Sequence, residues 1–143
     1  MFSNYKYEHL FENEKIFPTQ KNKIQLLLNT MSGRNVCSRK IKKEVINYIN
    51  YLKVDIIFCD SSTIGSFLKN IGRDAVRIVF FHNIEKNYAK NKLLHEGVGY
   101  IIPYFSYSYN EKHAVKAADF CIFLNERDKK QAKQLNKNKE GNI

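Results

Sequence analysis

The chain has 143 residues, 43% apolar and 13% aromatic, which suits one globular core and excludes two full domains. Lysine and arginine exceed aspartate and glutamate by 24 − 14 = 10, a charge that favours anionic partners such as phospholipid, nucleotide or nucleic acid without choosing among them. A lysine-rich composition spread along the whole chain is the other explanation. The three cysteines, Cys37, Cys59 and Cys121, are odd in number and lack Cys-x-x-Cys spacing, which argues against a disulfide framework and a zinc site and favours a reduced cytoplasmic location.

Residues 1–18 are polar and aromatic without a sustained period, and we expect an irregular N-terminal segment there. Acidic residues stand where an export signal would be basic, and no apolar run approaches the ~18 residues of a membrane span. We therefore expect a protein that is neither exported nor membrane-spanning.

Two amphipathic helices follow. The first begins near Thr19, a possible N-cap, and ends before Gly33, and its apolar residues recur at helical spacing at Ile24, Leu27, Leu28 and Met31. The second extends from Ser38, its N-cap, to about Lys53. Each apolar stripe requires a sheet or another helix to cover it.

Three short apolar runs predict strands at residues 54–59, 76–81 and 119–124. They lack polar alternation, which is typical of strands buried on both faces in a parallel sheet between two helical layers. Residues 62–71 predict a crossover helix, and two further helical patterns near 87–95 and 109–118 are separated by Gly97, Gly99 and Pro103. A basic helix is expected from Lys129. The fold class is therefore α/β, a three-layer Rossmann-like domain over residues 19–136 with a mainly parallel sheet, followed by a polar tail at 137–143.

Polar residues follow each predicted strand, where an open parallel sheet has its ligand crevice. They are Asp60, Ser61 and Ser62 after the first strand, His82, Asn83 and Glu85 after the second, and Asn125, Glu126 and Arg127 after the third. His82 places a titratable donor or acceptor at the mouth of the crevice. Structural roles are also open: Ser62 or Thr63 as a helix cap, and Asn125 with Asp128 as a cap and an acidic first turn.

Other functional classes lack support in the sequence. The signatures G-x-x-x-x-G-K-[ST], G-x-G-x-x-G, H-E-x-x-H and G-x-S-x-G do not occur, which argues against P-loop, simple dinucleotide-binding, zinc-protease and serine-hydrolase functions. We see neither a helix-turn-helix nor an aromatic RNA-binding platform, so no nucleic-acid partner is expected. An aromatic cluster suits either sugar stacking and a lipid interface or a partly buried core, and its members are Tyr100, Tyr104, Phe105, Tyr107 and Tyr109.

The segments VDIIFCDSSTIGSFLKNI, VRIVFFHNIEKNYAKN and YNEKHAVKAADFCIFLNERDKKQ resemble the N-terminal, acceptor-side domain of retaining GT-B glycosyltransferases, the bacterial family that builds capsular, exopolysaccharide and lipopolysaccharide chains. The resemblance covers residues 38–135. In that family the histidine that ends the second of these strands contacts the donor sugar and its phosphates, and His82 holds the matching position. The resemblance further implies ligand contacts in the loops that follow the three strands, from Asp60, Ser61, Asn83, Glu85, Asn125, Glu126 and Arg127.

The implied reaction transfers a sugar, with retention, from a UDP- or GDP-linked donor to a lipid-linked saccharide, without a metal or another cofactor. Two features depart from the family: no Gly-Gly loop or first strand precedes Thr19, and the second Rossmann domain, which holds most nucleotide contacts, is missing. We therefore expect an inactive half that requires a C-terminal domain or subunit and lies peripherally on the inner face of an anionic membrane. The alternative is a non-catalytic binding or interaction module on the same scaffold.

Overall fold

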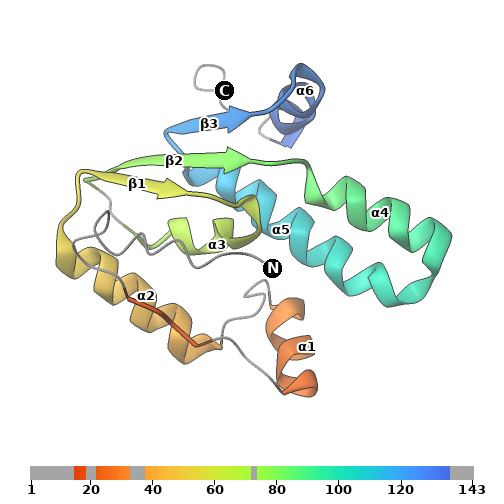
Figure 1. Cartoon of the computed structure of the whole chain (residues 1–143), viewed down its shortest axis with the longest axis horizontal. Helices are drawn as coiled ribbons and strands as arrows, with labels where there is room; N and C mark the ends of the chain where they lie inside the picture. Colours follow the sequence, from red (N-terminus) through yellow and green to blue (C-terminus); the bar gives the residue numbers. More distant parts are fainter. Residues whose placement is uncertain (1–14, 19–21, 33–37, 72–73, 136–143) are drawn as a thin grey trace, which may run out of the picture.

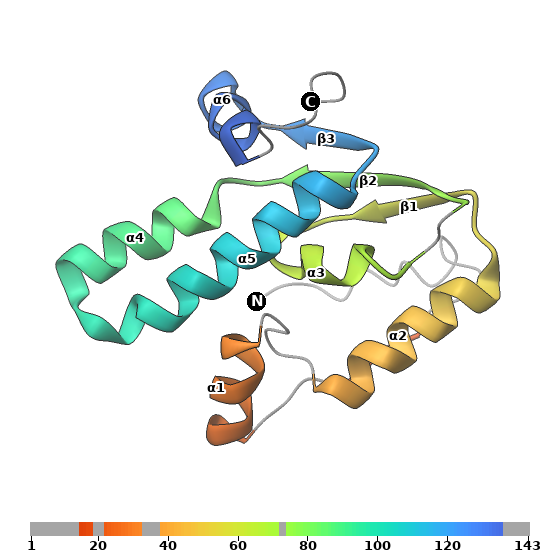
Figure 2. The ribbon, with the colours of Figure 1, turned by 180° about the vertical axis from the view of Figure 1, so that it is seen from behind.

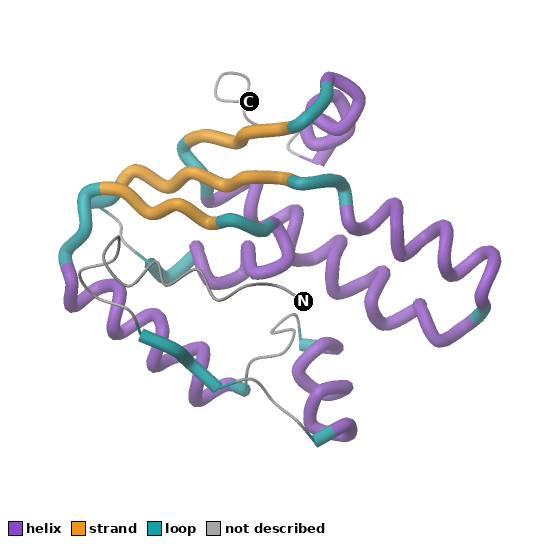
Figure 3. The backbone as a smooth tube through the Cα atoms, viewed as in Figure 1, coloured by secondary structure: helices purple, strands orange, loops and turns teal. Residues whose placement is uncertain are grey.

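The computed structural model describes residues 15–18, 22–32, 38–71 and 74–135. In chain order its elements are α1 (Lys23–Met31), α2 (Arg39–Leu52), β1 (Ile56–Cys59), the 3-10 helix η1 (Ser62–Ile64), α3 (Gly65–Leu68), β2 (Val76–Phe81), α4 (Glu85–Glu96), the 3-10 helix η2 (Val98–Tyr100), α5 (Ile101–Ala117), β3 (Phe120–Phe123) and α6 (Glu126–Leu135). Figure 1 shows the three strands side by side and pointing the same way, and Figure 3 shows that helices dominate the rest of the chain.

The sheet confirms the expected α/β class with parallel strands. Its order is β1-β2-β3, and both neighbouring pairs are parallel, with Ile56 opposite Val76 and Ile78 opposite Phe120. At the amino edge, Arg77 and Asp119 join β2 to the start of β3 through two side-chain hydrogen bonds of 3.1 Å. The carboxyl ends of all three strands therefore lie along the opposite edge.

The helices α3 and α5 lie on one side of this sheet in both views (Figures 1 and 2). Strands that follow one another in order, with crossovers of the usual single hand, place their connecting helices on the same face. The strand residues on that face are buried, for example Val79 and Phe81, whereas Ile56 and Phe58 on the opposite face are 60% and 56% exposed. Within the described residues the expected three layers are therefore wrong: the domain has two layers and an open, apolar sheet face.

Two of the expected helices differ in how well their ends were predicted. The second helix is confirmed, because Ser38 Oγ accepts a hydrogen bond from the Ile41 amide and Lys53 ends α2 in a left-handed conformation. The first is capped by Asn22, whose Oδ1 accepts from the amides of Ile24 and Gln25, so the prediction of Thr19 as the cap is wrong. Thr19 and Gly33 lie outside the described residues, as do the segments 1–14 and 136–143.

The connecting helices also differ from the prediction. The expected crossover helix is replaced by η1 and the four-residue α3, and Gly65 lies where they meet because a Cβ there would approach the Asn110 carbonyl oxygen to 2.2 Å. Pro103 does not break a helix but occupies the first turn of α5, where no intrahelical N–H bond is required. α6 begins at Glu126, before the expected start at Lys129.

Candidate functional site

The candidate site lies at the carboxyl edge of the sheet. Helices η1, α4 and α6 begin within a few residues of the ends of β1, β2 and β3, so each polar segment predicted from the sequence connects a strand to the start of a helix (Figure 1). The pairing of Phe81 with Phe123 sets the second and third of these segments side by side.

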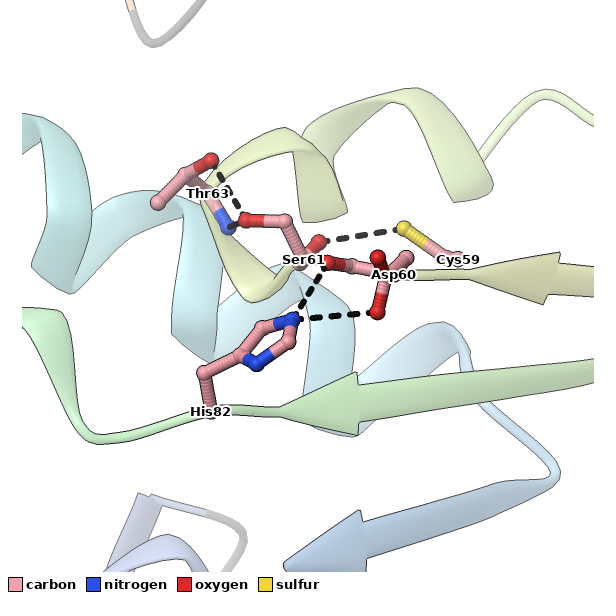
Figure 4. Close-up of polar contacts among 5 residues, drawn as sticks. All are labelled: Cys59, Asp60, Ser61, Thr63 and His82. Carbon is pink, nitrogen blue, oxygen red and sulfur yellow. Dashed lines mark hydrogen bonds and ion pairs between the residues drawn. The ribbon is translucent and has the colours of Figure 1, made fainter. Parts of the chain in front are cut away.

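Asp60 and His82 are joined across the first two strand exits. The Nε2 atom of His82 lies 3.0 Å from Asp60 Oδ1 and 3.1 Å from the Asp60 carbonyl oxygen (Figure 4). Both partners accept hydrogen bonds, so Nε2 carries the proton and Nδ1 of a neutral ring is left as an acceptor. The His82 side chain is 51% exposed and the Asp60 side chain 72%. The imidazole packs edge-on against the Phe80 ring, with 4.6 Å between the ring centroids. The imidazole is therefore oriented and open to a ligand.

The rest of the first exit is an N-cap. Ser61 Oγ accepts from the Thr63 amide at 3.2 Å and lies 2.8 Å from the Thr63 hydroxyl, so Ser61, rather than Ser62 or Thr63, caps the helix (Figure 4). Ser62, which was expected at the ligand-binding edge, is buried. Cys59 donates from Sγ to the Ser61 carbonyl, and burial raises the pKa of its thiol, as suits a core residue.

The second exit gathers His82, Asn83 and Glu85 near the start of α4. Partial burial raises the pKa of the Glu85 carboxyl, while the nearby His82 and a hydrogen bond from the Asn83 side chain oppose that rise. Asn83 and His82 are exposed, and Glu85 is half-buried as the first residue of α4. These three predicted residues therefore lie together at one strand end.

The third exit is occupied by a helix cap. Asn125 Oδ1 accepts from the Asp128 amide at 2.8 Å, and Asn125 Nδ2 donates to the Asp128 carboxylate at 2.9 Å, so the structural role of Asn125 is confirmed. Glu126 lies 3.7 Å from the Lys129 ammonium, and Arg127 is exposed. A hollow of about 300 Å³ lies here, lined by Cys121, Phe123, Leu124, Asn125, Glu126 and Lys129.

Two buried residues of α5, Asn110 and Glu111, were not among the predicted site residues. Glu111 Oε1 accepts from the Lys86 amide at 3.3 Å, at the start of α4. Burial raises the pKa of the Glu111 carboxyl to about 7, although hydrogen bonds from the Lys86 and Glu85 amides act to lower it. The signal in the sequence is helical spacing, because Asn110 and Glu111 lie one turn before Ala114 and Val115 on the buried face of α5.

Within the described part of the chain, no group of three or more His, Cys, Asp and Glu side chains is placed to ligate a metal ion. Over the same residues, none of the helices combines the length and the apolar character that crossing a bilayer requires.

Comparisons of the chain with protein-family models, with curated proteins and with solved structures gave no match. The resemblance to the GT-B glycosyltransferases therefore stays a prediction, carried by the quoted residues alone.

Proposed function

We propose that the chain is the acceptor-side domain of a retaining GT-B glycosyltransferase, which moves a sugar from a UDP- or GDP-linked donor to a lipid-linked saccharide in surface polysaccharide synthesis. One observation carries this proposal: the His82 ring is half-exposed at the carboxyl edge of a parallel sheet and held there by Asp60. A ring packed in the interior, or strands that did not form one sheet, would have removed its basis.

In the proposed reaction, His82 orients the sugar by accepting a hydrogen bond from a hydroxyl at Nδ1. The 3.0 Å contact with Asp60 Oδ1 engages Nε2 as the donor, so Nδ1 stays the acceptor for the sugar hydroxyl. Orientation of the donor against the acceptor then supplies much of the rate. No cofactor is needed for these steps.

The diphosphate itself requires donors from elsewhere. A helix N-terminus binds phosphate through free N–H groups, but amides at the starts of η1, α4 and α6 already donate to Ser61, Glu111 and Asn125. The proposal therefore assigns the nucleotide to a C-terminal domain or subunit, and the isolated chain is expected to be inactive.

An anionic membrane surface is the second partner that we propose. Burial lowers the pKa of His113, and four lysines lower it further: Lys69, Lys116, Lys42 and Lys112. The neighbouring groove between α1 and α5, about 480 Å³, is lined in part by Met31, Phe105, Tyr109 and Lys112. Exposed apolar side chains beside several lysines suit the headgroup region of an anionic bilayer, where lipid-linked acceptors reside.

A non-catalytic interaction module is the alternative, and the open sheet face favours it. Ile56, Phe58, Phe120 and Ile122 form an apolar surface on β1 and β3 that a partner protein would cover. In that case Ser61 and Asn125 serve only as helix caps, and the Asp60–His82 pair only joins two strand exits.

Nuclear magnetic resonance separates the two functions. UDP-glucose and GDP-mannose are titrated into the ¹⁵N-labelled chain, with UDP and GDP alone as references. We expect weak binding, with a dissociation constant of about 1 mM or above, and shifts concentrated at residues 60–63 and 82–85 that exceed those caused by the nucleotides alone.

The matched variants are His82→Ala, which should abolish these shifts, and His95→Ala, which removes an exposed histidine from the last turn of α4 and should leave them unchanged. Shifts spread over the lysines and removed by salt, or no shifts at all, would overturn the glycosyltransferase proposal and leave the interaction module.

A further inference from the structure

Two adjacent residues of α5 reach the starts of two different helices. Asn110 Oδ1 accepts from the Ser66 amide at 3.1 Å, in the first turn of α3, and Glu111 Oε1 accepts from the Lys86 amide at 3.3 Å, in the first turn of α4. α3 lies in the connection after β1, which contains Asp60, and α4 follows β2 and His82. Two neighbouring residues of α5 therefore contact the segments that follow Asp60 and His82.

Neither helix has a cap of its own. The residues at the two N-cap positions are Ile64 and Ile84, and neither side chain makes a capping hydrogen bond. Isoleucine cannot accept one, and side chains of α5 instead accept from the Ser66 amide of α3 and the Lys86 amide of α4. α4 is the longer of the two helices, and its start lies three residues after His82.

The two capping groups differ in one respect: Glu111 can lose or gain a proton near neutral pH, and the amide of Asn110 cannot. Glu111 is fully buried, and its Oε2 atom has no hydrogen-bond partner in the described residues. Burial raises its pKa to about 7, and the Glu85 carboxylate adds to the rise while the Lys86 ammonium opposes it. Both charged neighbours belong to the first turn of α4.

We propose that Glu111 is a positioning residue for the segment 82–85, and that uptake of a proton by its carboxylate alters the geometry of this segment and of the Asp60–His82 pair. The ionised carboxylate accepts charge-assisted hydrogen bonds and interacts favourably with the positive end of α4. The protonated group loses that charge, so the start of α4 is held less tightly. Only Ile84 and Asn83 separate Glu85 from His82, so a displacement at Glu85 reaches the imidazole through a short segment.

This coupling is a property of the protein itself, so it can be tested without a sugar ligand, and its failure is distinct from a failure to bind nucleotide sugars. Amide resonances of Glu85, Lys86 and Ser66 are followed between about pH 5 and pH 9. We expect the Glu85 and Lys86 amides to shift in one step with a midpoint near 7, and the Ser66 amide, held by Asn110, to lack this step.

Three variants identify the titrating group. Glu111→Gln keeps the shape and an acceptor oxygen, and should remove the step at Lys86. Glu96→Gln makes the same change at the exposed opposite end of α4 and should leave the step in place. His82→Gln should also leave it in place, because the imidazole is not its source.

A step that survives Glu111→Gln, or one that His82→Gln removes, would overturn the proposal, as would an unchanged Lys86 amide across the whole range. Should Glu111→Gln fail to fold, the carboxyl carbon of Glu111 is titrated in the unaltered protein by ¹³C resonance. Its midpoint must then coincide with that of the Lys86 amide, and a separate midpoint contradicts the coupling.

Discussion

Burial of the Glu111 carboxyl opposes folding at neutral pH, because the ionised form leaves water for an interior where one oxygen has no partner. His82, at the same edge of the sheet, is not buried in this way. Its ring remains about half exposed to solvent, and Nε2 contacts Asp60. The buried Glu111 carboxyl thus contacts the chain at Lys86, four residues after the open His82 ring. In our proposal, the unfavourable burial of the Glu111 carboxyl is offset because this carboxyl helps to position His82.

The pH dependence of stability should report the buried carboxyl. The pKa of Glu111 is about 7 in the folded protein against an ordinary value of 4.5, so the native state binds the proton more tightly than the unfolded state. The contribution of Glu111 to the free energy of unfolding is therefore largest below pH 4.5. It decreases by on the order of 3 kcal/mol as the pH rises to 7.

Urea unfolding at a series of pH values measures this change, and the comparison with Glu111→Gln isolates it. The difference in unfolding free energy between the two proteins should vary with pH across this window and level off above it. Parallel curves for the two proteins would show that Glu111 does not titrate in the folded state as expected.

At the scale of elements, the contact between α3 and α5 is closer than ordinary side chains permit. A Cβ at Gly65 would lie 2.2 Å from the Asn110 carbonyl oxygen and 2.5 Å from the Ala114 Cβ. This approach lets Asn110 reach the Ser66 amide, so the missing side chain and the cap from α5 belong to one arrangement. A larger residue would separate the helices and break the cap.

Gly65→Ala should therefore destabilise the protein by about 2 kcal/mol or more, through overpacking against backbone and loss of the Asn110 hydrogen bond. Chemical denaturation measures the loss. Gly99→Ala is the matched control, because a Cβ at Gly99 has no atom within 4 Å and its backbone lies outside the left-handed region. Equal unfolding midpoints for the two variants would refute the close approach at Gly65.

Local patterns predicted the elements better than the contacts between them. The strands and the cap at Ser38 follow from runs of a few residues, and the structure confirms them. The caps from Asn110 and Glu111 depend on residues that are more than twenty positions away in sequence, and periodicity carries no such information. The apolar strands likewise predicted burial on both faces, because a run of Ile, Val and Phe indicates a need for cover and not whether the chain provides it.

At the scale of the whole molecule, the excess of ten positive charges can define a membrane-binding site only where several lysines lie close together. Lys112 and Lys116 lie on α5 one turn apart, close enough to His113 to lower its pKa, and Lys112 also lines the groove beside α1. The positions of these lysines, and not the net charge alone, should therefore determine whether the chain binds to a membrane.

Vesicle flotation tests this expectation. The chain should float with vesicles that contain phosphatidylglycerol and not with pure phosphatidylcholine, and the double change Lys112→Glu with Lys116→Glu should weaken binding about tenfold or more. Lys90→Glu with Lys130→Glu, on the exposed surfaces of α4 and α6, gives the same net charge and should weaken it much less. Equal losses in both double variants would contradict a defined docking face.

On the face of the sheet that the described helices leave uncovered, the same positive charge has a second consequence. Two copies whose bare strands met would bury Ile56, Phe58, Phe120 and Ile122, yet each molecule carries ten surplus positive charges, so mutual repulsion opposes the encounter. Salt screens that repulsion, but it does not weaken the hydrophobic attraction between the apolar strand faces. Self-association of the chain should therefore increase with ionic strength, and a partner that covered the exposed strand face should remove that dependence.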